Sequence, residues 1–238
     1  MQKFFQFIST NSNYTRTNLP ITTQIVVHAV AGSGKTTLIK DFKRENPDYC
    51  SLFSTIENSD NFEGIKFLNP TEVNSSESHL GKLLILDEYL QAPKELLGKF
   101  DVLLSDPYQS PHQALEPHFI CNKSYRFGTQ TCNLLRSLGY NIESTSTTPE
   151  KITIARAFET EVIEPVIALE QEVVNLLEYN QVKSVSPCEV VGQQFTEVTL
   201  ILNNNNLREL NPVLLYLALS RHREHLLILT EDATISTS

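Results

Sequence analysis

The stretch His28-Ala-Val-Ala-Gly-Ser-Gly-Lys-Thr-Thr37 decides the fold of this chain. It follows an apolar run over residues 24–29 that predicts a buried strand, and it leads into a helical pattern over residues 36–43. A glycine-rich turn that joins a strand to a helix and ends in Lys-Thr is typical of a phosphate-binding P-loop. Glycine lets backbone N–H groups turn toward phosphate oxygens, and the start of the helix adds a positive end. The sequence therefore predicts an α/β fold built around a site for ATP and Mg²⁺.

The P-loop assigns a task to each of its residues. We expect the nucleotide-binding residues to be Ala31, Gly32, Ser33, Gly34, Lys35, Thr36 and Thr37. Lys35 would neutralise the β and γ phosphates, and Thr36 would coordinate Mg²⁺. One position departs from the usual motif, because Ala29 stands where its first glycine is expected. The alternative interpretation is a glycine-rich turn that precedes Lys-Thr by chance.

Two further apolar runs end in polar residues. Residues 83–86 (LLIL) are followed by Asp87 and Glu88, and the run after Asp101 leads to Gln109. Adjacent carboxylates at the end of a buried strand are costly unless they serve a ligand. We predict that Asp87 joins Thr36 in holding Mg²⁺, that Glu88 orients and polarises the attacking water, and that Gln109 contacts the γ-phosphate or that water. For Gln109, a surface side chain on a plain turn remains the alternative.

Strand-like runs alternate with helical patterns along the chain, which indicates parallel sheets with functional loops at the carboxyl ends of the strands. The predicted strands beyond the first cover residues 83–86, 102–104, 152–157, 166–169, 198–202 and 226–230, and further helices are predicted over residues 170–178 and 212–220. The proline-containing segment 107–117 is a plausible passage between two halves. We therefore expect residues 1–22 as an N-terminal extension, 23–110 as a first domain and 111–238 as a second.

Composition narrows the class of protein. The chain carries 19 Lys and Arg against 28 Asp and Glu, a net charge of −9, which argues against a non-specific nucleic-acid coat protein. Four scattered cysteines without a C-x-x-C pair predict free thiols in a reducing compartment. The apolar runs fall short of the ~20 residues that a spanning helix needs, so we expect a chain that is neither secreted nor membrane-spanning.

Three motifs in the second half complete an ordered series. They are Lys123-Ser-Tyr-Arg-Phe127, Val191-Gly-Gln-Gln-Phe195 and Ala218-Leu-Ser-Arg-His-Arg223. Taken in order after AGSGKT, ILDE and SDPYQ, they resemble the viral branch of helicase superfamily 1. Within that branch they resemble the first proteins of the triple gene block of plant RNA viruses, of the potexvirus and carlavirus type. The resemblance runs from about residue 24 to residue 229.

The resemblance implies two RecA-like P-loop domains with parallel sheets and the nucleotide in the cleft between them. It implies an ATP hydrolase that is stimulated by RNA, with duplex unwinding as an extension of that activity. Arg126 and Arg221 match arginines that reach the γ-phosphate, so they join Lys35, Glu88 and Gln109 as expected catalytic residues. For each arginine the alternative is a solvated surface charge. The family pattern also places an RNA contact around residues 53–55, although Phe53 is more readily expected in the core.

The family's biological roles are the cell-to-cell movement of viral RNA through plasmodesmata and the suppression of host RNA silencing. The resemblance implies as partners single-stranded viral RNA, the coat protein, small membrane-embedded movement proteins and host silencing factors, in the host cytoplasm. A homo-oligomer is left open. Two alternatives remain at this point: an RNA- and protein-binding interaction protein that uses ATP as a structural ligand or switch without productive unwinding, and a cellular P-loop ATPase without nucleic acid.

Overall fold

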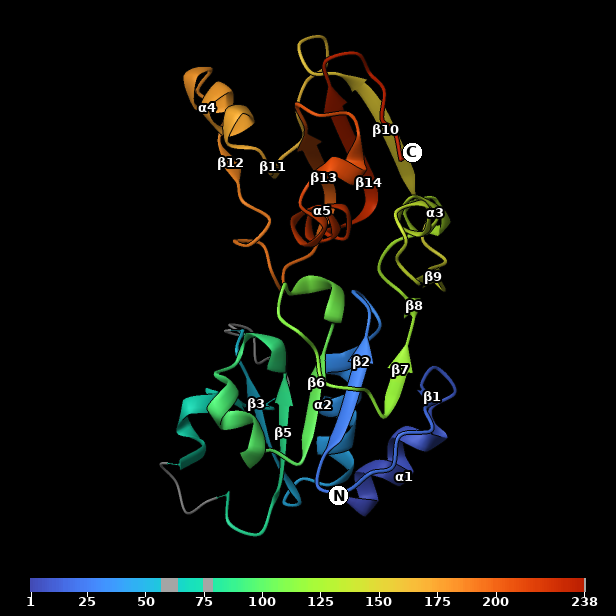
Figure 1. Cartoon of the computed structure of the whole chain (residues 1–238), viewed down its shortest axis with the longest axis vertical. Coiled ribbons are helices and arrows are strands. Elements are labelled where there is room, and N and C mark those ends of the chain that lie inside the picture. The colour runs from blue at the N-terminus through green and yellow to red at the C-terminus, as the bar shows by residue number, and fades with distance from the viewer. Residues whose placement is uncertain (57–63, 75–78, 238) are drawn as a thin grey trace. The chain divides into compact units, whose positions relative to one another are not determined.

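The computed structural model describes residues 1–56, 64–74 and 79–237, and the chain divides into two compact units (Figure 1). Unit 1 comprises Met1–Lys123 and unit 2 comprises Ser124–Ser238. Each unit is built on a sheet of its own, as the predicted α/β class requires. Among the described residues, no helix combines the length and the apolar character that crossing a membrane demands.

The described part of unit 1 forms a seven-stranded sheet in the order β1-β7-β2-β6-β5-β3-β4. All neighbouring strands run parallel except β1 and β7. The central strands are buried along almost their whole length, as expected when helices cover both faces of a parallel sheet. The strands are β1 (Thr15–Arg16), β2 (Ile25–Ala29), β3 (Cys50–Ser54), β4 (Phe67–Leu68), β5 (Leu83–Asp87), β6 (Val102–Ser105) and β7 (Phe119–Cys121). The helices are α1 (Gln2–Thr10) and α2 (Lys35–Glu45), with 3₁₀ turns at Pro70–Asn74, Tyr89–Gln91, Lys94–Lys99 and Pro107–Gln109.

The limits of unit 1 differ from the expected ones at both ends. The N-terminal segment is not a separate extension, because Phe4 and Ile8 of α1 are fully buried in the unit 1 core. The Phe4 ring meets the Phe42 ring of α2 edge-on, with centroids 5.1 Å apart. The expected boundary at residue 110 is corrected to residue 123, because β7 pairs in parallel with β2 and so completes the first sheet.

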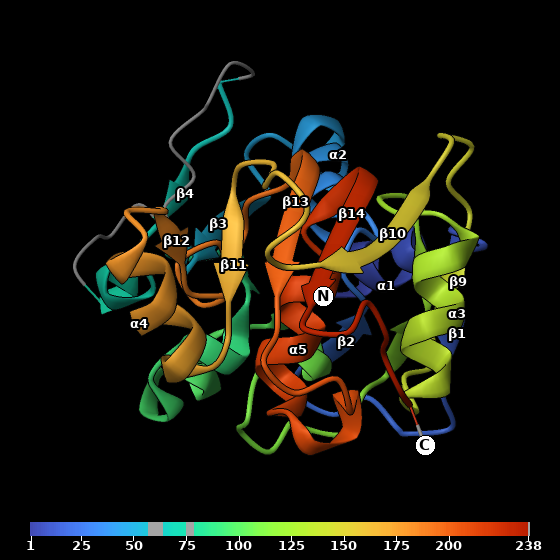
Figure 2. The ribbon, with the colours of Figure 1, turned by 90° about the horizontal axis from the view of Figure 1, so that it is seen from above.

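The larger sheet of unit 2 has five parallel strands in the order β10-β14-β13-β11-β12 (Figure 2). Helix α4 packs on one face, where Val173 and Leu177 join a core formed with β11, β13 and β14. The strands are β10 (Lys151–Arg156), β11 (Val166–Ala168), β12 (Ser184–Val185), β13 (Phe195–Ile201) and β14 (His222–Thr230), and a second, two-stranded sheet joins β8 (Lys123–Ser124) to β9 (Glu143–Ser144). The helices are α3 (Thr129–Ser137), α4 (Gln171–Tyr179) and α5 (Pro212–Leu219), with a 3₁₀ turn at Leu207–Glu209.

Candidate active site

The P-loop occupies residues 30–34, between the end of β2 and the start of α2. Gly32 and Gly34 have φ angles of 72° and 84°, in the left-handed region that glycine tolerates. A Cβ built on Gly34 would meet nothing within 4 Å, so the loop is open on that side. Ala29 lies in regular strand conformation at the end of β2. Alanine is therefore accommodated without strain where the usual motif has glycine.

Lys35 is the first residue of α2, and its side chain is buried. Its Nζ donates to the carbonyl oxygen of Ala29 over 3.0 Å and lies 3.6 Å from Oε1 of Glu88. These contacts hold the ammonium group between the carbonyl oxygen of Ala29 and the carboxylate of Glu88. The buried Oγ of Ser33 has no hydrogen-bond partner among residues 1–56, 64–74 and 79–237. Thr37, by contrast, is exposed on the first turn of α2.

Asp87 ends β5 and faces the start of α2. The hydroxyl of Thr36 donates to Oδ2 of Asp87 over 2.9 Å, and the backbone N–H of Glu88 donates to Oδ1 over 3.2 Å. Burial and the neighbouring Glu88 carboxylate raise the pKa of Asp87 to about 7, against the lowering effects of Lys35 and Thr36. A hydroxyl and a carboxylate oxygen this close form the hard-oxygen donor set that Mg²⁺ prefers.

Glu88 adopts a backbone conformation that is uncommon for a residue with a side chain, with φ 57° and ψ 48°. The hydroxyl of Thr55 donates to its carbonyl oxygen over 3.2 Å. Ser105, the last residue of β6, donates to Oε2 over 3.0 Å. The carboxylate is thus fixed from two sides, by Ser105 at one oxygen and by Lys35 near the other.

Gln109 lies on the 3₁₀ turn that follows β6. Its Nε2 donates to Oδ2 of Asp106 over 3.0 Å, and Asp106 also accepts the backbone N–H of Tyr108. Since β6 stands between β2 and β5 in the sheet, Gln109 follows the strand that separates the P-loop from Asp87 and Glu88. The carboxyl edge of these three strands therefore carries the P-loop, the Asp87-Glu88 pair and Gln109, as ligand sites in such sheets do.

The two predicted arginines lie together in unit 2. Arg126 donates from Nη1 to the carbonyl oxygen of Ser220 over 2.9 Å, directly beside Arg221. Arg221 is only 1% exposed, and its Nε donates to the carbonyl oxygen of Leu217 over 3.0 Å. Its Nη1 donates to the carbonyl oxygen of Gln193 over 3.2 Å. Three motifs that are far apart in the sequence thus meet at one place, and Arg221 is not a solvated surface charge.

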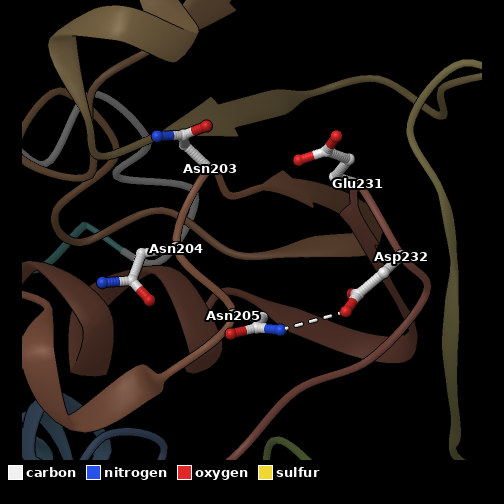
Figure 3. A pocket seen from close by; sticks show the side chains of 5 residues that line it. All are labelled: Asn203, Asn204, Asn205, Glu231 and Asp232. Atoms are coloured by element: carbon white, nitrogen blue, oxygen red, sulfur yellow. Dashed lines mark hydrogen bonds between the residues drawn. The ribbon is translucent and has the colours of Figure 1, made fainter.

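A hollow lies at the carboxyl ends of strands β13 and β14 of unit 2, whereas Arg221 precedes β14 (Figure 3). Three consecutive asparagines that follow β13 and two acidic residues that follow β14 line it: Asn203, Asn204, Asn205, Glu231 and Asp232. Asn205 Nδ2 donates to Oδ2 of Asp232 over 3.2 Å (Figure 3). Because both ionisable groups in this lining are acidic, the hollow does not suit a phosphate. The asparagine run ends at Asn206, whose side chain caps the 3₁₀ turn Leu207–Glu209.

Comparison with known proteins identifies the family. Residues 25–230 match the family described as the viral superfamily 1 RNA helicase core domain. The movement and silencing protein TGBp1 of Papaya mosaic potexvirus is 37% identical over 94% of this chain and 94% of its own length. The chain belongs to the TGBp1 branch of the viral superfamily 1 helicases. The TGBp1 of Apple stem pitting virus (isolate PA66) is 38% identical over 91% of this chain and 94% of its own length.

A solved structure agrees with this assignment at the level of the fold. The crystal structure of Arterivirus nonstructural protein 10, a helicase, aligns with 95% of this chain at a TM-score of 0.50 and 17% identity. This chain spans 56% of the length of that protein. The RecA-like fold predicted from the motif order is therefore confirmed.

The residues present in this chain fit a magnesium-bound nucleotide, as membership of a helicase family implies. The fit rests on the open loop at Gly34, the buried and unpartnered hydroxyl of Ser33 among the described residues, and the Thr36–Asp87 oxygen pair. The predicted RNA contact at Phe53 does not fit. Its ring is fully buried and packs edge-on against Phe100, so the core interpretation is correct.

The sequence motifs do not identify two further candidate functional residues, Ser105 and Glu150. Ser105 stands inside a quoted motif, yet only the register of β5 against β6 brings it to Glu88. Glu150 precedes β10 in a polar segment without a motif, but its buried carboxylate contacts His222 beside Arg221. Both contacts join residues that are distant in the chain, so a local sequence pattern cannot predict them.

Proposed function

We propose that this chain is an RNA-stimulated ATPase that acts as a viral movement protein and as a suppressor of host RNA silencing. The family is that of viral RNA helicases, and the relatives named above are movement and silencing proteins. The observation that carries the enzymatic part is the meeting of Lys35, Thr36, Asp87 and Glu88 at one edge of the unit 1 sheet.

Nucleotide binding would use the groups of the P-loop and the first turn of α2. The N–H groups of a first helical turn have no partners within the helix, so they are available to phosphate oxygens. The ammonium group of Lys35 adds a positive charge at the base of the loop. Thr36 and Asp87 would hold Mg²⁺, which when bound neutralises charge on the phosphate oxygens.

Glu88 would act on the attacking water. Ser105 holds Oε2 of this carboxylate, and we assign to Oε1, the oxygen near Lys35, the task of accepting the proton. Gln109, fixed by Asp106, would orient the same water with its side-chain amide.

Arg126 and Arg221 would supply positive charge to the phosphates during transfer. Arginines in this role accelerate hydrolysis by about 10³- to 10⁵-fold. Both arginines belong to unit 2, whereas the P-loop and the Asp87-Glu88 pair belong to unit 1.

The partners follow from the same proposal. We assign to the chain single-stranded viral RNA as substrate, and coat protein, small membrane-embedded movement proteins and host silencing factors as protein partners. The proposed place of action is the host cytoplasm, with plasmodesmata reached through the membrane-embedded partners. The net charge of −9 means that RNA binding must rest on local groups, and we expect it to weaken steeply with salt.

The test is steady-state ATP hydrolysis at low salt, with and without single-stranded RNA. Wild type is compared with Lys35→Ala and with Lys40→Ala, which removes a lysine from the same helix outside the P-loop. We expect RNA to stimulate wild type and Lys40→Ala, and Lys35→Ala to lose hydrolysis in both conditions. Hydrolysis that survives in Lys35→Ala would overturn the site assignment.

The RNA dependence of hydrolysis and the biological role are tested separately from the assignment of the ATP site. Hydrolysis that needs Lys35 but ignores RNA would overturn the RNA-coupled ATPase and favour ATP as a structural ligand or switch. A silencing-suppression assay with Glu88→Gln then separates the roles. We expect this variant to lose both hydrolysis and suppression, whereas full suppression without hydrolysis would show that suppression rests on binding alone.

A further inference from the structure

The carboxylate of Glu150 is an unusual group to find buried in unit 2. Its side chain is 3% exposed and lies at the start of α3, where it accepts the backbone N–H of Gly128 over 2.7 Å and that of Thr131 over 3.0 Å. A negative charge at a helix N-terminus is stabilising. A Cβ on Gly128 would come within 2.8 Å of Cβ of Glu150, so the close approach of the two residues requires glycine at 128.

The same carboxylate holds the first residue of β14. Nε2 of His222 lies 3.1 Å from Oε1 of Glu150 and 3.0 Å from the hydroxyl of Thr131. His222 is fully buried, and its Nδ1 has no hydrogen-bond partner among the described residues. A buried ring nitrogen without a partner is destabilising, so an apolar residue would serve packing alone better. The use of histidine here indicates that the contact with Glu150 matters.

Two residues that Glu150 contacts, Gly128 and His222, lie close in the chain to the two arginines. His222 follows Arg221 in the chain, and Gly128 lies two residues after Arg126. The Arg126 guanidinium in turn reaches the carbonyl oxygen of Ser220, next to Arg221. One buried carboxylate therefore fastens the loop that carries Arg126 to the strand end that carries Arg221.

We propose that Glu150 and His222 are positioning residues that fix the Arg126 and Arg221 guanidinium groups relative to each other for phosphoryl transfer. The inference rests on the proposed role of the arginines. Neither residue is placed on the nucleotide itself. Their loss should lower kcat while nucleotide binding by the unit 1 loop is retained.

The experiment measures RNA-stimulated ATP hydrolysis by the full chain carrying Glu150→Gln. Glutamine keeps the shape but presents an amide donor where two backbone N–H groups need acceptors. We expect kcat to fall about tenfold or more, with KM for ATP within about twofold, since misplacement of catalytic groups by about 1 Å costs up to a hundredfold in rate. Glu170→Gln is the control, because Glu170, at the N-cap of α4, likewise accepts two backbone N–H groups, those of Asn203 and Asn204 in the loop after β13.

A double-mutant comparison separates positioning from general damage. If Glu150 acts through the arginines, adding Glu150→Gln to a variant that carries both Arg126→Ala and Arg221→Ala lowers kcat no further, because residues that act as a unit are non-additive. Equal additional losses in both backgrounds, or a Glu150→Gln variant with the kcat of Glu170→Gln, would overturn the proposal. Unchanged kcat in Arg221→Ala and Arg126→Ala would overturn the role of the arginines instead.

A second pair of variants keeps the proposal testable if Glu150→Gln does not fold. In His222→Gln the amide nitrogen takes the place of Nε2 and can still donate to Glu150, whereas His222→Leu cannot. We expect His222→Gln to retain kcat within about threefold and His222→Leu to lose about tenfold or more, in line with the loss of a hydrogen bond to a charged group. Equal kcat values for these two variants would contradict the positioning role.

Discussion

The hydroxyl of Thr36 and the carboxylate of Asp87 lie in direct contact, with Oγ1 donating to Oδ2 over 2.9 Å although the residues are 51 positions apart. Thr36 belongs to the first turn of α2, which follows β2, and Asp87 ends β5. Strand β6 separates β2 from β5 in the sheet. The helix start must therefore reach across one strand, and this reach brings the two oxygens into contact.

We predict that Thr36→Ala and Asp87→Asn raise the Mg²⁺ concentration required for half-maximal ATP hydrolysis by about tenfold or more, since each removes or neutralises one oxygen of the pair. Thr36→Ser keeps the hydroxyl and serves as the control, with an Mg²⁺ requirement close to that of wild type. Titration of the hydrolysis rate with Mg²⁺ at saturating ATP gives the three values. An unchanged requirement in Thr36→Ala would show that the hydroxyl does not serve the ion.

Ser105→Ala removes the hydrogen bond to Oε2 of Glu88 and leaves the carboxylate in place. A hydrogen bond to a charged group contributes about 1.5–3 kcal/mol, so its loss from the fixed carboxylate is expected to lower kcat by about 10- to 100-fold with little change in KM. Ser51→Ala is the matched control, because Ser51 is a buried strand serine bonded to His79 elsewhere in the same sheet. If both variants lose kcat alike, the effect belongs to the sheet and not to Glu88.

Sequence alone predicts the fold class, and it places the expected nucleotide-binding groups of unit 1 at strand ends, for a physical reason. The P-loop and the Asp87-Glu88 pair are local patterns at strand ends, and parallel topology brings such ends to one edge. The boundary at residue 110 was wrong because β7 is only three residues long and returns to pair with β2 after a long loop. The same limit hid Glu150, whose importance comes from contacts with Gly128 and His222 that no local spacing encodes.

Substitutions of Phe53 test whether this residue belongs to the core or contacts RNA. Because its ring is fully buried against Phe100, we expect Phe53→Ala to lower the free energy of unfolding by about 3–5 kcal/mol. Phe53→Leu should cost less than about 1.5 kcal/mol and leave RNA affinity unchanged. Urea unfolding followed by circular dichroism suits a chain without tryptophan, and filter binding at low salt measures RNA affinity.

The control for Phe53 is an exposed aromatic residue in unit 2. Tyr179 is 87% exposed, so Tyr179→Leu should leave the free energy of unfolding almost unchanged. An RNA affinity that falls in a folded Phe53→Leu variant, by the ~1–3 kcal/mol that stacking on one base contributes, would restore the RNA contact that the family pattern implied.

The pH dependence of stability tests the state of the Glu150 carboxylate. Burial alone would raise the pKa of Glu150, but hydrogen bonds from His222, Thr131 and Gly128 outweigh it and hold the pKa below its ordinary value. A carboxylate whose pKa is lower in the folded state stabilises the fold above its unfolded pKa of about 4.3, and this contribution is lost as pH falls through the folded pKa. Wild type should therefore exceed Glu150→Gln in free energy of unfolding at pH 6, and the difference should shrink as pH falls below about 4.3. Urea unfolding at stepped pH, with Glu170→Gln measured in parallel, gives this difference, and a gap that stays constant down to low pH would show that the charge of Glu150 does not stabilise unit 2.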